Sequence, residues 1–433
     1  MVEQESVVIH QLGEDEAQQR SFYRLLHNDR LSTDEIKAYL YADCQRQVEA
    51  GKHYLVIQDT TQPNFERNRG NIKHQEGLGV IGNNKDLGFF LHPSLVVEAA
   101  SGRCIGYSHV TTWSRSLADS AKKTVAAPPL EDKESYRWLA SPLASQVVLA
   151  QAAQLSLIVD READMNELFQ RIPNERTHLL IRACQDRRIV ESGQGTRLYA
   201  WLAHQEEGGR FTLSVKADTR TQRSKREASI VLRWGKVELA PFDLKGQVLE
   251  VYALEAREEN PPAGEKPILW RLLTTHTLES ARQAQQITQW YSERWHIEQV
   301  FRLLKQQGLN VERSDLESGK SLIQLTLLAL LTVSKIMLLH LSAKQQEPQL
   351  IAQSFTSAEI DCMKALHQKY EGKTPKQKNP YPPDSLQWCY WIMARLGGWK
   401  PHEKKAGVIS LMRGLRRFHQ IFHGWLLAKQ VVS

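Results

Sequence analysis

The chain has 433 residues, which is enough for two or three domains with real hydrophobic cores. Its 41% hydrophobic and 24% charged residues are typical of a folded, soluble protein and exclude a disordered chain. The net charge of +7 allows a nucleic-acid partner without requiring one. The five cysteines are scattered, with no Cys-x-x-Cys and no Cys/His ligand spacing. We therefore expect no disulfide framework, no zinc site and a reducing, cytoplasmic compartment.

The first half of the chain predicts helices followed by strands and helices in alternation. Residues 15–50 read as helices, one of them opened by a capping pattern at 32–35. Apolar runs at 53–59 and 155–160 predict two buried strands, each ending in an aspartate. Further predicted elements are a hairpin at 88–113 turning at Ser101-Gly102, helices at 133–151 and 161–172, and a strand at 177–184.

The second half of the chain has a different secondary-structure pattern. From about 205 to 268 the pattern is all-β, and a strand at 268–275 precedes one long helix over 279–307. After 345 the chain is helical apart from a Pro/Lys-rich loop at 371–385. The stretch 321–341 has the length of a membrane span, but Gln324, Lys335 and His340 interrupt it. We expect a buried helix there and no membrane partner.

Three carboxylates stand out as candidate metal ligands. Asp59 and Asp160 end two predicted strands, and the carboxyl ends of adjacent parallel strands form the crevice where chemistry occurs in open sheets. Glu298, on the long helix, could supply a third ligand. Three hard oxygen ligands suit Mg²⁺ or Mn²⁺, and two such ions could support phosphoryl transfer. The alternatives are structural: a helix N-cap for Asp160, an Asx turn for Asp59 and an i,i+4 ion pair for Glu298.

The segment 291–305, "YSERWHIEQVFRLLK", carries an unusual set of side chains for a surface helix. At about 100° per residue, six functional side chains share about one third of the circumference. They are Tyr291, Arg294, Trp295, Glu298, Arg302 and Lys305. The opposite side is apolar, as a core-facing stripe should be.

These residues resemble a known family. Tyr291, Arg294, Glu298 and Lys305 form a Y-x2-R-x3-E-x6-K pattern that looks like the third catalytic block of bacterial DDE insertion-sequence transposases. "VIQDTT" and "IVDREADM" are similar to the blocks that carry the first and second aspartates, and "ENPPAGEKPILWRLLT" looks like transposon-five transposase. The resemblance runs from about residue 20 to the C-terminus. It implies metal-dependent cleavage at transposon ends and strand transfer, with Mg²⁺ as cofactor and Mn²⁺ as a substitute.

The resemblance also implies roles for individual residues. Asp59, Asp160 and Glu298 would be the catalytic metal ligands. Tyr291, Arg294 and Arg182 would bind phosphates, Lys305 would contact DNA, and Trp270 would stack on a flipped base. Trp295 would be a second stacking residue, and Arg302 would join the DNA-facing set; both tryptophans could instead be core residues. The basic loop, with Arg220, Arg223, Lys225 and Arg226, is either a DNA-backbone clamp or a solvated loop.

The fold expected from the resemblance is α/β: a ribonuclease-H-like catalytic core at 51–345, with a β-rich insertion at 205–268. Residues 1–50 would be a helical remnant of an N-terminal DNA-binding domain, and residues 346–433 a helical dimerisation region. Double-stranded DNA and a second copy in a synaptic complex would be the partners, in the bacterial cytoplasm and nucleoid. Because only 58 residues precede Asp59, two alternatives remain. One is a shortened, dimerising, non-catalytic inhibitor of transposition, and the other is a metal nuclease without strand transfer.

Overall fold

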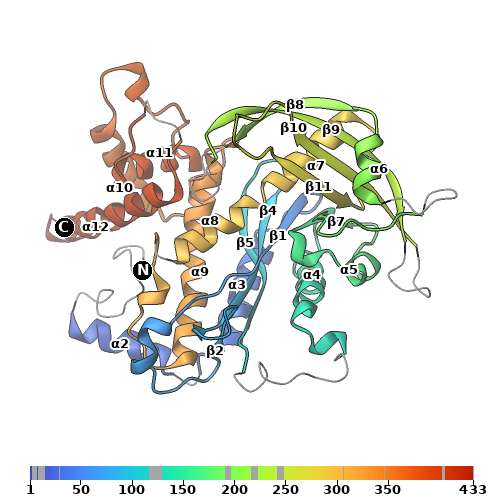
Figure 1. Cartoon of the computed structure of the whole chain (residues 1–433). Helices are drawn as coiled ribbons and strands as arrows, with labels where there is room; N and C mark the ends of the chain where they lie inside the picture. The colour runs from blue at the N-terminus through green and yellow to red at the C-terminus, as the bar shows by residue number, and fades with distance from the viewer. Residues whose placement is uncertain are drawn as a thin grey trace. The chain divides into compact units, whose positions relative to one another are not determined.

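The computed structural model describes residues 1, 7, 15–28, 30–116, 129–190, 197–215, 223–240, 248–305, 307–345, 347–401 and 405–432. The chain forms two compact units (Figure 1). Unit 1 comprises Met1–Val48, Thr60–Ala127 and His296–Ser433, and unit 2 comprises Glu49–Asp59 and Pro128–Trp295.

Unit 2 is built on a mixed sheet with the strand order β1-β6-β7-β11-β10-β9-β8. The strands are β1 (His53–Gln58), β6 (Gln154–Val159), β7 (Thr177–Arg182), β8 (Gly209–Val215), β9 (Arg226–Leu239), β10 (Leu249–Glu258) and β11 (Leu269–Thr274). β1, β6 and β7 are parallel neighbours, and the other four strands pair antiparallel. The predicted β-rich stretch therefore continues the core sheet through β11.

Among the residues that the structure describes, this unit contains the α-helices α4 (Arg137–Val148), α5 (Asn166–Arg171), α6 (Leu198–His204) and α7 (Ala281–Ser292). Helix α5 is shorter than predicted, because a 3-10 turn at Arg161–Ala163 precedes it. Helix α7 begins beside β8 and β9 and reaches the end of β6, where its Tyr291 contacts Asp160 (Figure 1). The mostly apolar strands β1, β6 and β7 are almost entirely buried, as expected for the parallel centre of a sheet.

Unit 1 combines helices with two hairpins. Its helices are α2 (Glu16–Leu26), α3 (Thr33–Arg46), α8 (Trp295–Leu304, except its first residue), α9 (Gly319–Ser342), α10 (Ser357–Tyr370), α11 (Leu386–Leu396) and α12 (Val408–Val432). Its strands are β2 (Gly79–Val80), β3 (Leu87–Gly88), β4 (Phe90–Glu98) and β5 (Cys104–Trp113). The predicted hairpin turn contains Gly102 at φ +72°, a conformation that glycine adopts without strain. The capping box predicted at 32–35 is present, with Ser32 and Glu35 bonded reciprocally.

Helix α9 is the central helix of unit 1 and packs against α3, β5, α11 and α12. It is the one helix in the described part of the chain that is long and apolar enough to cross a membrane. Within its most apolar window, 72% of the helix is buried inside the protein. The expectation of a buried helix at 321–341 is confirmed.

Candidate active site

Asp59 and Asp160 lie at the carboxyl ends of neighbouring parallel strands. β1 and β6 pair in register, with Ile57 opposite Ile158, so both aspartates leave the sheet at the same edge. Their side chains are 27% and 31% exposed, so both carboxylates are accessible. The predicted adjacency of the two strand ends is confirmed.

One arginine bridges the two carboxylates. Nη1 of Arg294 lies 3.0 Å from Oδ2 of Asp59 and 3.9 Å from Oδ2 of Asp160. The guanidinium group is 13% exposed, so its charge is only partly screened by solvent. One guanidinium group thus lies within ion-pair distance of both carboxylates. The sequence predicted Arg294 as a phosphate ligand. In the structure its guanidinium group donates a hydrogen bond to Asp59 and forms an ion pair with Asp160.

Tyr291 approaches Asp160 from α7. Its hydroxyl donates a hydrogen bond to Oδ1 of Asp160, at 3.2 Å, and the residue is 3% exposed. Burial, followed by the charge of Asp160, raises the pKa of Tyr291 well above its usual value, so the hydroxyl stays a donor. Asp160 stands at the N-cap position of the 3-10 turn that follows, but its side chain makes no capping hydrogen bond there.

Two further predicted residues lie near this group. The half-buried ring of Trp270, on β11, meets the Tyr291 ring edge-on, with centroids 5.4 Å apart. Arg182, at the end of β7, lies close enough for its charge to lower the pKa of Tyr291, against the larger effect of burial. Unit 2 thus brings together six predicted site residues: Asp59, Asp160, Arg182, Trp270, Tyr291 and Arg294.

The prediction of one continuous helix over 279–307 is wrong. Helix α7 ends at Ser292 and α8 begins at Trp295. The amide of Arg294 bonds to the carbonyl of Tyr291, three residues back, so the last turn of α7 tightens before the chain leaves it. The single face predicted for 291–305 therefore does not exist as one helical surface, and the side chain of Arg294 extends from the turn to the aspartates.

Helix α8 keeps the predicted amphipathic pattern over its own length. Its buried residues include Ile297, Val300, Leu303 and Leu304, as predicted, and His296 as well. Glu298 is half-buried in the first turn and belongs to unit 1. Trp295 is 38% exposed, which favours a surface role over a core role. Arg302 is exposed and donates to the side chain of Gln307.

A comparison with protein families gives this geometry a context. Residues 148–333 match the family model described as Transposase DDE domain. The match supports a DDE transposase and, with it, DNA as a substrate and an enzyme that cleaves and joins DNA strands. It includes Asp160, Tyr291, Arg294 and Glu298, whereas Asp59 lies before it. A mixed α/β fold with a large mixed sheet is consistent with the expected ribonuclease-H-like core.

The DDE pattern implies a divalent metal, and the donor set of unit 2 fits one in part. Asp59 and Asp160 offer hard, accessible carboxylate oxygens, which Mg²⁺ and Mn²⁺ prefer. Within the described ranges, no group of three or more His, Cys, Asp or Glu residues is arranged to hold a metal ion. Arg294 supplies positive charge to both carboxylates. The approach of Glu298 as a third ligand stays a prediction.

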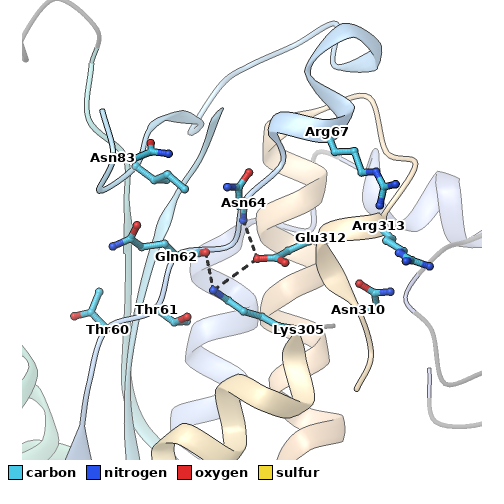
Figure 2. A pocket seen from close by; sticks show the side chains of 11 residues that line it. Thr60, Thr61, Gln62, Asn64, Arg67, Asn83, Lys305, Asn310, Glu312 and Arg313 are labelled. Atoms are coloured by element: carbon cyan, nitrogen blue, oxygen red, sulfur yellow. Dashed lines mark hydrogen bonds and ion pairs between the residues drawn. The ribbon is translucent and has the colours of Figure 1, made fainter. Parts of the chain in front are cut away.

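Lys305, the last residue of the DDE-like pattern, follows α8 and contributes to a pocket in unit 1 (Figure 2). Its Nζ donates to the carbonyl of Gln62, at 2.8 Å, and lies 3.6 Å from Glu312. Burial lowers the pKa of Lys305, and the charge of Glu312 opposes this effect. Lys305 therefore holds two chain segments together, in addition to any contact with DNA.

The predicted basic loop is described only in part. Arg220 lies outside the described residues, and Arg223 and Lys225 precede β9 with half-buried and exposed side chains. Arg226 is bound to Glu258 and Glu265, with its side chain 12% exposed. Because two carboxylates neutralise Arg226, its charge stabilises the fold and is not available to DNA. Of the four residues predicted to clamp the DNA backbone, Arg223 and Lys225 remain candidates within the described residues.

The other two acids of the "DREAD" run, Glu162 and Asp164, are both paired with arginines. Asp164 is fully buried and lies 2.5 Å from Arg187, and it also accepts from the amide of Cys184. Glu162 pairs with Arg137, at 3.0 Å. Sequence reasoning missed the lining of the Lys305 pocket. Two features of the sequence could have indicated this pocket: the closely spaced Arg67 and Arg69, and the segment "VER" at 311–313.

Proposed function

We propose that this protein is a DDE transposase that cleaves DNA at transposon ends and transfers the strands to a target. The observation that carries the proposal is the pair of aspartates at neighbouring strand ends, held by Arg294 and Tyr291. The match to the transposase DDE domain supports it. We place Asp59, Asp160 and Glu298 as catalytic metal ligands for Mg²⁺, with Mn²⁺ as a substitute.

The chemistry expected is phosphoryl transfer. A bound divalent ion would activate water and stabilise the leaving 3′ oxygen. Tyr291 orients Asp160 by donating to one carboxylate oxygen, which leaves the other oxygen available as a ligand. Arg294 places one positive charge beside both carboxylates. Its guanidinium donors can serve the aspartates or a DNA phosphate, but the same donor cannot serve both.

An inhibitor that dimerises without catalysing transposition is the second candidate. It would not require the aspartates to be oriented, whereas Tyr291 and Arg294 are both bonded to them. The geometry therefore favours catalysis. Arg182 and Trp270 would bind the DNA end beside the cleavage point, with Trp295 and Arg302 as further DNA contacts.

The test is cleavage of a duplex that carries the inverted repeats flanking the coding sequence, with Mg²⁺ present. Asp59→Asn and Asp160→Asn should each lower the cleavage rate by at least about a hundredfold, because even losing a group behind a metal ligand costs about 10- to 100-fold. DNA binding should persist. Glu162→Gln, two residues from Asp160, is the matched control and should cleave at nearly the wild-type rate. Wild-type cleavage by either aspartate variant would remove that residue from the active site.

A further inference from the structure

A polar pocket of about 870 Å³ lies in unit 1, between the segment 60–67 on one side and Lys305 with the segment 310–313 on the other (Figure 2). Its lining contains three cations, Arg67, Lys305 and Arg313, against one carboxylate, Glu312. The remaining lining is mostly amide and hydroxyl side chains, and no aromatic ring contributes among the described residues. The pocket therefore has the charge to bind an anion but no surface on which a base could stack.

The cations differ in what already neutralises them. Lys305 is close to Glu312, 3.6 Å away, and is bonded to Gln62. Glu312 also accepts from the amide of Asn64, at 3.1 Å, so the pair holds one wall of the pocket together. The carboxylate of Glu312 is thus already used by groups of the protein, and its charge neutralises Lys305 rather than the arginines.

Arg67 and Arg313 are both exposed, and neither guanidinium group has a hydrogen bond or ion pair within the part of the chain that the structure describes. Figure 2 shows their guanidinium groups on the same side of the pocket. Beside them, the side-chain oxygen of Asn310 is buried and has no hydrogen-bond partner among the described residues. That oxygen accepts hydrogen bonds and cannot donate to a phosphate. The donors on this side of the pocket are therefore the two unneutralised guanidinium groups.

We propose that this pocket binds the phosphate backbone of duplex DNA, with Arg67 and Arg313 as the phosphate ligands. Guanidinium groups suit the task, since their planar donors match phosphate oxygens in pairs. The absence of aromatic lining favours a duplex over unstacked single strands, which proteins bind by stacking. The inference rests on the proposed function, because it assigns the pocket to the DNA that a transposase must hold.

The experiment measures the affinity of the full chain for a short duplex of arbitrary sequence, by fluorescence anisotropy, between about 50 and 200 mM salt. Arg67→Gln and Arg313→Gln should each reduce the slope of log affinity against log salt by about 0.9, and the double variant by about 1.8. Arg69→Gln is the matched control. Arg69 is two residues from Arg67 but is already paired with Glu66, at 3.0 Å, so its loss should leave the slope unchanged.

Three results would overturn the proposal. They are an unchanged slope in the double variant, an equal loss of slope in Arg69→Gln, and losses that appear with single-stranded DNA but not with duplex. Thermal unfolding of each variant checks that the fold is intact. This test can fail independently of the proposed function. If the wild-type chain cleaves DNA while the double variant keeps the salt slope, only the proposal that the pocket binds DNA is refuted. A lowered slope without any cleavage refutes only the catalytic proposal.

Discussion

At the scale of residues, Asp160 depends on the hydroxyl of Tyr291 for its orientation. The ring of Tyr291 is buried and makes an edge contact with Trp270. Packing of the ring therefore fixes the position of the hydroxyl group. A hydrogen bond to a charged group contributes about 1.5–3 kcal/mol. This interaction is therefore large enough to matter for catalysis if Asp160 binds metal.

Tyr291→Phe should keep the ring contacts and remove only this hydrogen bond. We expect cleavage to fall by about 10- to 100-fold, mostly in kcat, because the loss acts on Asp160, the proposed metal ligand. Steady-state cleavage over a range of DNA concentrations measures the effect.

Tyr23→Phe is the matched control, because its hydroxyl also donates to an aspartate, Asp315, at 3.1 Å. That variant should cleave normally. A Tyr291→Phe enzyme as active as wild type would show that the hydroxyl does not position Asp160.

The sequence predicted the positions of Asp59 and Asp160 because an apolar strand ending in an acid is a local pattern. It could not predict that Arg294 reaches both of them. That contact joins residues 235 positions apart in the chain, and it depends on where α7 ends. Residue type and spacing identified Arg294 as functional without specifying its partner.

At the scale of elements, hydrophobic periodicity predicted most strands and helices correctly, and it failed at a helix end. The segment 279–307 has no proline or glycine before Gly308, so nothing local marks the interruption between α7 and α8. The strands β8, β9 and β10 were also predicted. Their continuation of the core sheet was not, because strand pairing is a long-range property.

Unit 2 also contains a histidine cluster that the sequence did not reveal: His53 on β1, His178 on β7 and His276 just after β11, of which His276 is buried and the other two are half-buried. Nε2 of His53 and Nε2 of His276 lie 2.8 and 2.6 Å from the hydroxyl of Ser156, and His178 stacks on His276 with centroids 4.2 Å apart. Trp290 of α7 meets His53 edge-on. Burial and the neighbouring histidines lower the pKa of His53 to about 4 and that of His276 to about 2.

This cluster should make stability depend on pH. Because the folded pKa values are lowered, the unfolded chain binds protons below about pH 6.5 that the folded chain does not. The free energy of unfolding should therefore fall as pH drops from about 6.5 towards 4. The expected loss between about pH 7 and pH 5 is about 2 kcal/mol for each of His53 and His276. Urea denaturation at the two pH values measures it.

His276→Gln should reduce this pH dependence while keeping a group that can bond to Ser156. His204→Gln, on the surface of α6, is the control and should leave the dependence unchanged. Equal stability of the wild-type chain at the two pH values would contradict the argument.

At the scale of the whole molecule, a transposase must bring two DNA ends together, and we propose that helix α12 contributes the dimer contact. The helix packs against α11 through Gly414, beside the backbone of Met393 and Gly397, so its first half belongs to the core. Phe418 is fully buried, but Ile421 is 38% and Leu427 64% exposed further along. An exposed apolar surface at a helix end is typical of an interaction site.

Leu427→Glu should therefore convert a dimer into a monomer, as measured by sedimentation velocity at micromolar concentration. Burying a leucine contributes about 1.5–3 kcal/mol, and two-fold symmetry counts each substitution twice. The dissociation constant should rise by at least about a hundredfold. Val147→Glu is the control: it places the same charge on a valine of α4 that is 73% exposed, and it should leave the dimer intact. A wild-type chain that sediments as a monomer, or a Leu427→Glu chain as dimeric as wild type, would exclude this surface as the contact.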